Sequence, residues 1–172
     1  MRLRLRLLYI FFKSLFIKKK SSVLDDTILK LMVFPNDVDI KYVTNDRYLS
    51  FMDLGRIFFI FSYTNILLMI RKKWIPVATN IFIQYRYPLK LFQTFNLSTR
   101  IVWWDHKHFY LTQKFEKNNR VLCSAIVCAT FMSEKGLVPT SDILQAMNKE
   151  AIRPEKPDFI ETFQNNHPPH KI

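Results

Sequence analysis

The longest helical pattern in the chain runs from Asn45 to Phe61. In a helix, this segment would carry apolar side chains around most of its circumference, which a helix tolerates only when other structure encloses it. Thr44, Asn45 and Asp46 stand at its start, and their side chains can accept hydrogen bonds from the free N–H groups of a first helical turn. The sequence therefore predicts a buried central helix over residues 45–61.

From Val77 onward the hydrophobic period changes from helical to two, which is typical of strands. A short β-prone segment also precedes the helix and ends at Pro35. The predicted strands cover residues 27–34, 77–87 and 95–103, a segment that begins at 109, and residues 121–132, which are apolar on both faces. This order predicts an α+β fold, with an antiparallel sheet of about five strands and a last short helix over residues 140–147.

The two ends of the chain differ from this central domain, which we place at residues 23–150. Residues 1–22 are basic and apolar, but the uncharged run from Leu7 to Phe12 is far below the ~20 residues needed to cross a bilayer core. Lys13 interrupts the run and no small-residue cleavage site follows, so we expect this segment to be retained. It either lies on an anionic membrane surface or packs on the domain itself. Residues 151–172 are polar and proline-bearing, and we expect them to be disordered.

The formal net charge of +12 predicts an acidic partner. Nucleic acid, an anionic membrane and a phosphate-bearing ligand such as coenzyme A all meet this description, and charge alone does not choose among them. Cys123 and Cys128 lie five residues apart on one predicted strand, so their side chains point to opposite faces and cannot form a disulfide. A reducing compartment follows, which predicts a cytoplasmic location, with peripheral attachment to the inner membrane as an open alternative.

The segment Asn36–Arg56 reads NDVDIKYVTNDRYLSFMDLGR and resembles the signature of hotdog-fold acyl-CoA thioesterases of the hydroxybenzoyl-CoA thioesterase-like branch. The resemblance extends over residues 29–147. It implies a hotdog fold, in which the sheet wraps around the central helix, here with an extra basic amphipathic helix at the N-terminus. It also implies hydrolysis of an acyl-CoA without a cofactor, in a homodimer or tetramer whose active sites form between protomers. The matching residues are Asp37, Asp39, Asn45, Arg47, Tyr48, Leu49, Met52, Asp53, Gly55 and Arg56.

The resemblance also assigns candidate site residues. The second aspartate of the Asp37/Asp39 pair carries the attack in the family, which makes Asp39 the catalytic candidate, as base or nucleophile. Asp53 is a second catalytic candidate, because another branch keeps a catalytic carboxylate near this place on the helix. The substrate-binding candidates are Asn45, Arg47, Tyr48 and Arg56. The alternative is structural: Asp37 and Asp39 form turns, and Asp53 pairs with Arg56 or Arg47.

Two further functions stay open. A non-catalytic acyl-CoA binder on the same fold is motivated by departures from the family pattern: the family histidine is absent near Tyr42 and Val43, and one residue is missing before Tyr48. A nucleic-acid-binding module is motivated by charge alone and is the least supported. No nucleotide-binding glycine loop or G-x-S-x-G motif occurs. We expect no metal site at His167 and His170, and exposed positions for His106 and His108.

Overall fold

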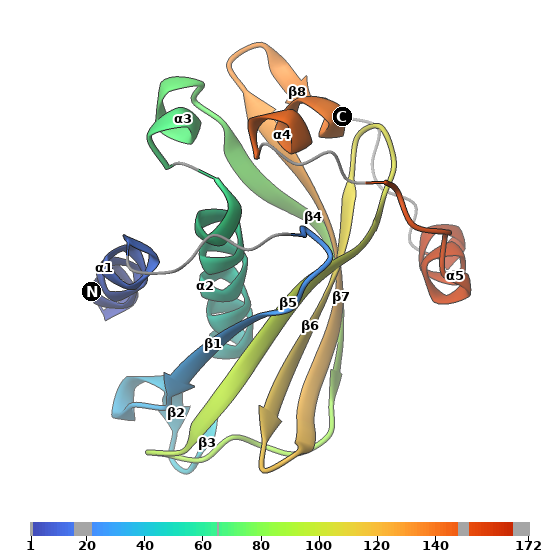
Figure 1. Ribbon diagram of the computed structural model, residues 1–172. Coiled ribbons are helices and arrows are strands. Elements are labelled where there is room, and N and C mark those ends of the chain that lie inside the picture. The colour runs from blue at the N-terminus through green and yellow to red at the C-terminus, as the bar shows by residue number, and fades with distance from the viewer. Residues whose placement is uncertain (1, 16–21, 65, 148–151, 167–172) are drawn as a thin grey trace.

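The computed structural model describes residues 2–15, 22–64, 66–147 and 152–166. Its centre is the helix α2 (Asn45–Tyr63), which lies along the concave face of a curled antiparallel sheet (Figure 1). The predicted central helix is therefore confirmed and continues two residues beyond Phe61. A short helix, α3 (Ile66–Arg71), follows it and leads into the long strands of the sheet.

The main sheet has the strand order β1-β5-β6-β7-β4, with β8 added beside β7. The bounds of its strands are β1 Thr27–Met32, β4 Ile75–Tyr85, β5 Thr94–Trp104, β6 Phe109–Lys117, β7 Arg120–Ser133 and β8 Gly136–Val138. Because β1 precedes the helix and the four long strands follow it, this is the α+β hotdog arrangement that the resemblance implied. The 3-10 turn Pro35–Asp37 and a small hairpin of β2 (Val38–Asp39) and β3 (Tyr42–Val43) connect β1 to the helix.

The core fills the space between α2 and the sheet. Phe51 of α2 is fully buried and packs edge-on against Phe95 of β5, with ring centroids 5.3 Å apart. Phe95 in turn stacks on Phe115 of β6 at 5.4 Å. Burying one such side chain stabilises the fold by roughly 1.5–3 kcal/mol, so this aromatic cluster fixes the helix against the sheet.

The start of α2 differs from the sequence expectation in detail. Thr44 occupies the N-cap position, but its side chain accepts no hydrogen bond from the first helical turn. The Thr44 hydroxyl instead donates to the Asp46 carboxylate. The carbonyl of Thr44 accepts the N–H groups of Arg47 and Tyr48, so ordinary backbone bonds close this turn.

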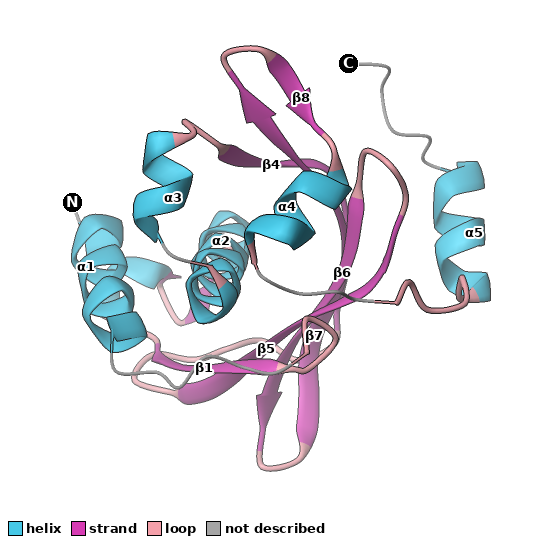
Figure 2. Ribbon diagram, turned by 45° about the horizontal axis from the view of Figure 1, so that its top comes forward, coloured by secondary structure: helices cyan, strands magenta, loops and turns pink. Residues whose placement is uncertain are grey.

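The N-terminal helix α1 (Arg2–Leu15) packs on the flank of α2 (Figures 1 and 2). Ile10 is fully buried there, which supports the alternative that this segment packs on the domain. The opposite side of α1 still exposes Leu8 and Phe12. Residues 16–21 of the predicted N-terminal segment lie outside the described residues. Packing of one face therefore leaves the membrane alternative open for the other face.

The C-terminal region corrects the predicted disordered tail. Residues 158–166 form the helix α5 (Asp158–Asn166), which lies on the outer face of the sheet, opposite α2 (Figure 2). Its buried Ile160 and Phe163 pack with Tyr110 and Cys128. Two apolar side chains spaced three apart on one helical face supply the burial that the proline-bearing composition concealed. His167 and His170 lie outside the described residues.

The two cysteines follow the prediction. Both lie on β7 as free, buried thiols. Cys123 belongs to the main core under α2, whereas Cys128 packs in the outer cluster with α5. Burial raises the pKa of both thiols, to about 12 for Cys123, so both stay protonated and unreactive at neutral pH.

Candidate active site

A cavity of about 260 Å³ lies between α2 and the sheet. Two segments outside this sandwich also line it: Leu7 of α1, and Met147 directly after the helix α4 (Thr140–Ala146). The wall away from solvent consists of buried apolar side chains, namely those of Phe59, Ile101, Phe109, Leu111, Phe131 and Met147. The exposed lining residues Asp53, Pro76 and Val77 mark its open side. The cavity therefore joins an apolar interior to a polar rim.

The rim carries one ion pair, between Asp53 and Arg56 on successive turns of α2. The Asp53 side chain is 58% exposed, whereas that of Arg56 is only 11% exposed. Burial lowers the pKa of the Arg56 guanidinium, and the Asp53 carboxylate offsets this only in part. A guanidinium is still protonated at neutral pH, so the pair presents a carboxylate to solvent with a fixed cation behind it. The predicted pairing of Asp53 with Arg56 is confirmed.

Gln113 of β6 holds Arg56 from below. The Arg56 Nη1 donates a hydrogen bond of 2.9 Å to the Gln113 Oε1. The Gln113 Nε2 donates to the Met52 carbonyl and to the Thr99 hydroxyl, both at 3.0 Å. Because Gln113 is fully buried, these bonds fix its position and with it the orientation of Arg56. The sequence analysis missed Gln113, although a polar residue between Leu111 and Phe115 on the inward face of a strand was a readable signal.

Gly55 explains how the helix comes close enough for these bonds. A Cβ at this position would lie 2.7 Å from Leu97 Cδ2 and 2.9 Å from both Gln113 Nε2 and Thr99 Oγ1. Any other residue would displace the side chains that hold Arg56. The M-D-x-G-R stretch is thus one unit: Asp53 and Arg56 form the rim, and Gly55 admits the supporting glutamine.

Asp37 has a structural partner. Its carboxylate receives two hydrogen bonds from the Arg6 guanidinium of α1, at 3.0 and 2.5 Å, and a third from the Phe34 N–H at 2.8 Å. The Asp37 side chain is buried, at 6% exposure, and that of Arg6 is largely shielded, at 13%. The guanidinium also lies 4.9 Å from the ring centre of Phe51. Asp37 therefore anchors α1, in addition to forming the turn that the sequence predicted.

Asp39 lies at the end of β2, in the hairpin with β3. The following residue, Ile40, is fully exposed and has a positive φ of 58°. Asp39 is also exposed and is not among the described residues that line the cavity. The structure of a single chain thus brings Asp53 and Arg56 together but leaves Asp39 apart from them. The catalytic role of Asp39 stays a prediction.

The other predicted binding residues surround the start of α2. Tyr48 is buried, and its hydroxyl accepts the Leu89 N–H at 2.9 Å, which gives it a structural contact. Asn45 is exposed, and the half-buried Arg47 lies 3.5 Å from the Asp46 carboxylate. The binding roles of Asn45, Arg47 and Tyr48 stay predictions.

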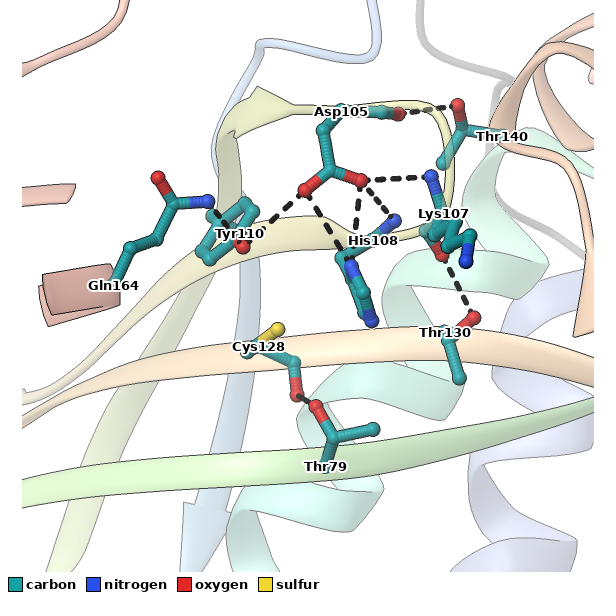
Figure 3. A network of polar contacts seen from close by, with 9 residues as sticks. All are labelled: Thr79, Asp105, Lys107, His108, Tyr110, Cys128, Thr130, Thr140 and Gln164. Carbon is teal, nitrogen blue, oxygen red and sulfur yellow. Dashed lines mark hydrogen bonds and ion pairs between the residues drawn. The ribbon is translucent and has the colours of Figure 1, made fainter. Parts of the chain in front are cut away.

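A second polar cluster lies at the turn between β5 and β6 (Figure 3). One Asp105 carboxylate oxygen accepts the N–H groups of Lys107 and His108, both at 2.7 Å, and the other lies 3.4 Å from the His108 ring. Burial would raise the pKa of Asp105, but these hydrogen bonds from His108 and Lys107 hold it below its ordinary value. His106 is exposed as predicted, but the prediction for His108 was wrong: it is buried, because its side chain turns inward to Asp105.

This cluster fastens two C-terminal helices to the sheet. The Thr140 hydroxyl, at the start of α4, donates to the Asp105 carbonyl at 2.6 Å, and the Thr140 N–H donates to the His106 carbonyl at 3.1 Å. The Gln164 side chain of α5 donates to the Tyr110 hydroxyl at 2.5 Å, and that hydroxyl lies 3.4 Å from Asp105 (Figure 3). The turn therefore fixes α4, and with it the Met147 side of the cavity.

A family model, sequence relatives and solved structures all relate this chain to thioesterase-like proteins. The model of the thioesterase-like superfamily matches residues 33–159. Protein THEM6 of Drosophila melanogaster is 28% identical over 164 residues, covering 92% of this chain and 82% of that protein. The gentisyl-coenzyme A thioesterase BH1999 superposes with a TM-score of 0.64 and 21% identity, over 69% of this chain and 99% of that one. SAV2348 of Staphylococcus aureus, solved in complex with CoA, has a TM-score of 0.62 and 14% identity, over 89% and 98%.

Proposed function

Because the chain belongs to the thioesterase-like superfamily, we propose that it hydrolyses an acyl-CoA thioester to the free acid and CoA. The observation that carries this proposal is the apolar cavity with a carboxylate and a guanidinium at its rim. An acyl group gains from an apolar space, and hydrolysis needs a base beside the carbonyl carbon. Both requirements meet at Asp53. The reaction consumes only water, so it calls for no cofactor.

In the proposed reaction, the Asp53 carboxylate takes a proton from a water molecule, whose oxygen attacks the thioester carbonyl carbon. The carbonyl oxygen becomes an oxyanion, which donors placed near it stabilise. The C–S bond then breaks, the carbonyl re-forms, and the CoA sulfur leaves with the proton that Asp53 took up. Arg56 holds the Asp53 carboxylate in place through the hydrogen bond that it donates to it.

Asp39 is the competing base. The family resemblance favours it, and active sites formed between protomers are part of that resemblance. For Asp39 to act, the exposed β2–β3 hairpin of one protomer would have to reach the cavity of its partner in the dimer. Exchange of each aspartate for asparagine separates the two candidates, as set out below.

The start of α2 is the proposed contact for the CoA phosphates. Asn45 is exposed there beside Arg47, and a helix N-terminus carries free N–H groups and a positive dipole end. The net charge of +12 attracts a polyanionic ligand to the surface as a whole.

A free-thiol release assay on a panel of acyl-CoA substrates tests the proposal. Thiol release well above the rate without protein is the expected result. Binding of acyl-CoA without release on any member of the panel would select the alternative, a non-catalytic acyl-CoA binder, which the missing family histidine motivates.

We further propose a homodimer formed through β4. This strand is at the edge of the sheet, and its side chains Ile75, Val77, Phe82 and Tyr85 are exposed. A free edge with apolar side chains is a template for pairing with a second copy. Light scattering should give twice the chain mass; a stable monomer at micromolar concentration would refute the dimer.

Attachment to an anionic membrane surface is proposed for residues 1–20. The described part of the chain contains no helix that is both long and apolar enough to span a bilayer. The proposal rests on the exposed Leu8 and Phe12 and on six cations among these residues of the sequence, not counting Arg6, which is paired with Asp37; the segment has no acidic residue. Deletion of residues 1–20 should abolish co-sedimentation with anionic vesicles. Equal binding by the truncated protein would contradict this.

A further inference from the structure

The chemistry of the cavity wall restricts the acyl group. Among the described residues that line the cavity, the charged or polar side chains are Asp53 and Arg56, and these are paired with each other at the rim. The interior offers side chains such as Phe109, Leu111 and Phe131, without a hydroxyl, amide or imidazole group. A hydroxyl buried without a hydrogen-bond partner costs roughly 1–3 kcal/mol. A hydroxylated aromatic acyl group, such as the gentisyl group in the name of BH1999, is therefore disfavoured here.

The size of the cavity restricts the acyl group further. If a chain carbon takes about the ~30 Å³ that a water molecule occupies in the liquid, a cavity of about 260 Å³ holds roughly nine carbons. This volume is also below the ~300 Å³ at the lower end of the usual range for ligand pockets. A long fatty acyl chain exceeds this space, whereas a chain of medium length fills it.

Met147 is a lining residue that comes from outside the helix–sheet sandwich. It is 4% exposed, and its N–H bonds to the carbonyls of Ile143 and Leu144 hold it at the end of α4. The start of α4 is tied to the β5–β6 turn through Thr140 (Figure 3). An unbranched, flexible side chain on an anchored helix thus forms part of the buried wall.

We propose that the cavity takes an unsubstituted aliphatic acyl group of medium length and that Met147 determines the length that is accepted. This inference rests on the proposed thioesterase function and names the substrate class for that site. The acyl chain enters from the Asp53 side, with the thioester left at the rim.

The test measures kcat/KM for thiol release from straight-chain CoA thioesters from acetyl-CoA to palmitoyl-CoA, with 4-hydroxybenzoyl-CoA as the hydroxyaromatic member. The highest kcat/KM of the full chain should fall within the range from hexanoyl-CoA to decanoyl-CoA. In Met147→Ala the ratio of kcat/KM for lauroyl-CoA to kcat/KM for octanoyl-CoA should rise about 15-fold. The shortened side chain makes room for about two methylenes, and each methylene that becomes buried contributes roughly fourfold. Met147→Phe should shift the optimum to shorter chains.

Leu144→Ala is the matched control. Leu144 is also buried on α4 but does not line the cavity, so this variant reports loss of packing without a change of the wall. Its chain-length optimum should equal that of the unchanged protein. The inference is overturned if both Met147 variants keep the chain-length optimum of the unchanged protein. It is also overturned if the unchanged protein prefers the hydroxyaromatic substrate.

Binding separates this inference from the proposed function. If no thioester releases thiol, hydrolysis is refuted, and affinities for non-hydrolysable S-alkyl-CoA thioethers then give the chain-length optimum by calorimetry. A medium-length optimum that moves to longer chains in Met147→Ala supports the inference for a binding protein. An optimum that does not move refutes it as well.

Discussion

Asp53→Asn should reduce thiol release by about 100-fold to 10,000-fold, the range typical of losing a general base. The substitution removes the basic oxygen but keeps an amide oxygen that can accept the Arg56 hydrogen bond. Asp53 itself is 58% exposed, but the buried Arg56 loses its counter-ion, so the free energy of unfolding should fall by about 1–2 kcal/mol, which leaves the protein folded. The loss should therefore appear in kcat at unchanged fold, which kinetics and thermal unfolding of the same preparation measure together.

Two matched variants show whether the loss is specific to Asp53. Asp39→Asn makes the same chemical change in the competing candidate, and Asp158→Asn makes it at an exposed position at the start of α5, on the outer face of the sheet. Asp158→Asn should keep nearly full activity. A large loss in Asp39→Asn with a small one in Asp53→Asn would transfer the base to the β2–β3 hairpin and would require a partner protomer to bring it to the cavity. Asp37→Asn is unsuitable as a control, because Asp37 is bound to Arg6.

The sequence predicted the elements whose pattern is local. The period of two located β4 to β7, and the apolar circumference located α2, because burial of each element shows directly in its own residues. The alternative that Asp53 pairs with Arg56 was predictable for the same reason, because the two residues are three apart on one helix.

Contacts between distant segments were not predictable in this way. Arg6 and Asp37 are thirty-one residues apart, and nothing in either neighbourhood specifies the other. α5 was missed because its few apolar residues are surrounded by polar ones and prolines, and only the outer sheet face gives Ile160 and Phe163 a place to pack. His108 was expected to be exposed because turns are polar. In the structure, its ring is buried and lies 3.4 Å from the Asp105 carboxylate.

The second large effect concerns the anchor of α1. Arg6→Ala should lower the free energy of unfolding by about 3 kcal/mol, because it leaves the Asp37 carboxylate buried without its counter-ion. Asp37→Ala should cost a similar amount for the opposite reason. Urea unfolding of both single variants and of the double variant measures the pair. The double variant should be less destabilised than the sum of the two, since it leaves no unpaired charge.

Lys30→Ala is the control for charge, because it also removes one cation but at an exposed position on β1; it should change stability by less than about 0.5 kcal/mol. Additive effects of the Arg6 and Asp37 substitutions would mean that the two side chains do not act as a pair. The anchor also reaches the cavity, because Leu7, next to Arg6, lines it. Arg6→Ala should therefore make α1 more sensitive to limited proteolysis and should weaken acyl-chain selectivity, whereas Lys30→Ala should do neither. In this chain, the first aspartate of the family signature holds the helix that contributes Leu7 to the wall of the cavity.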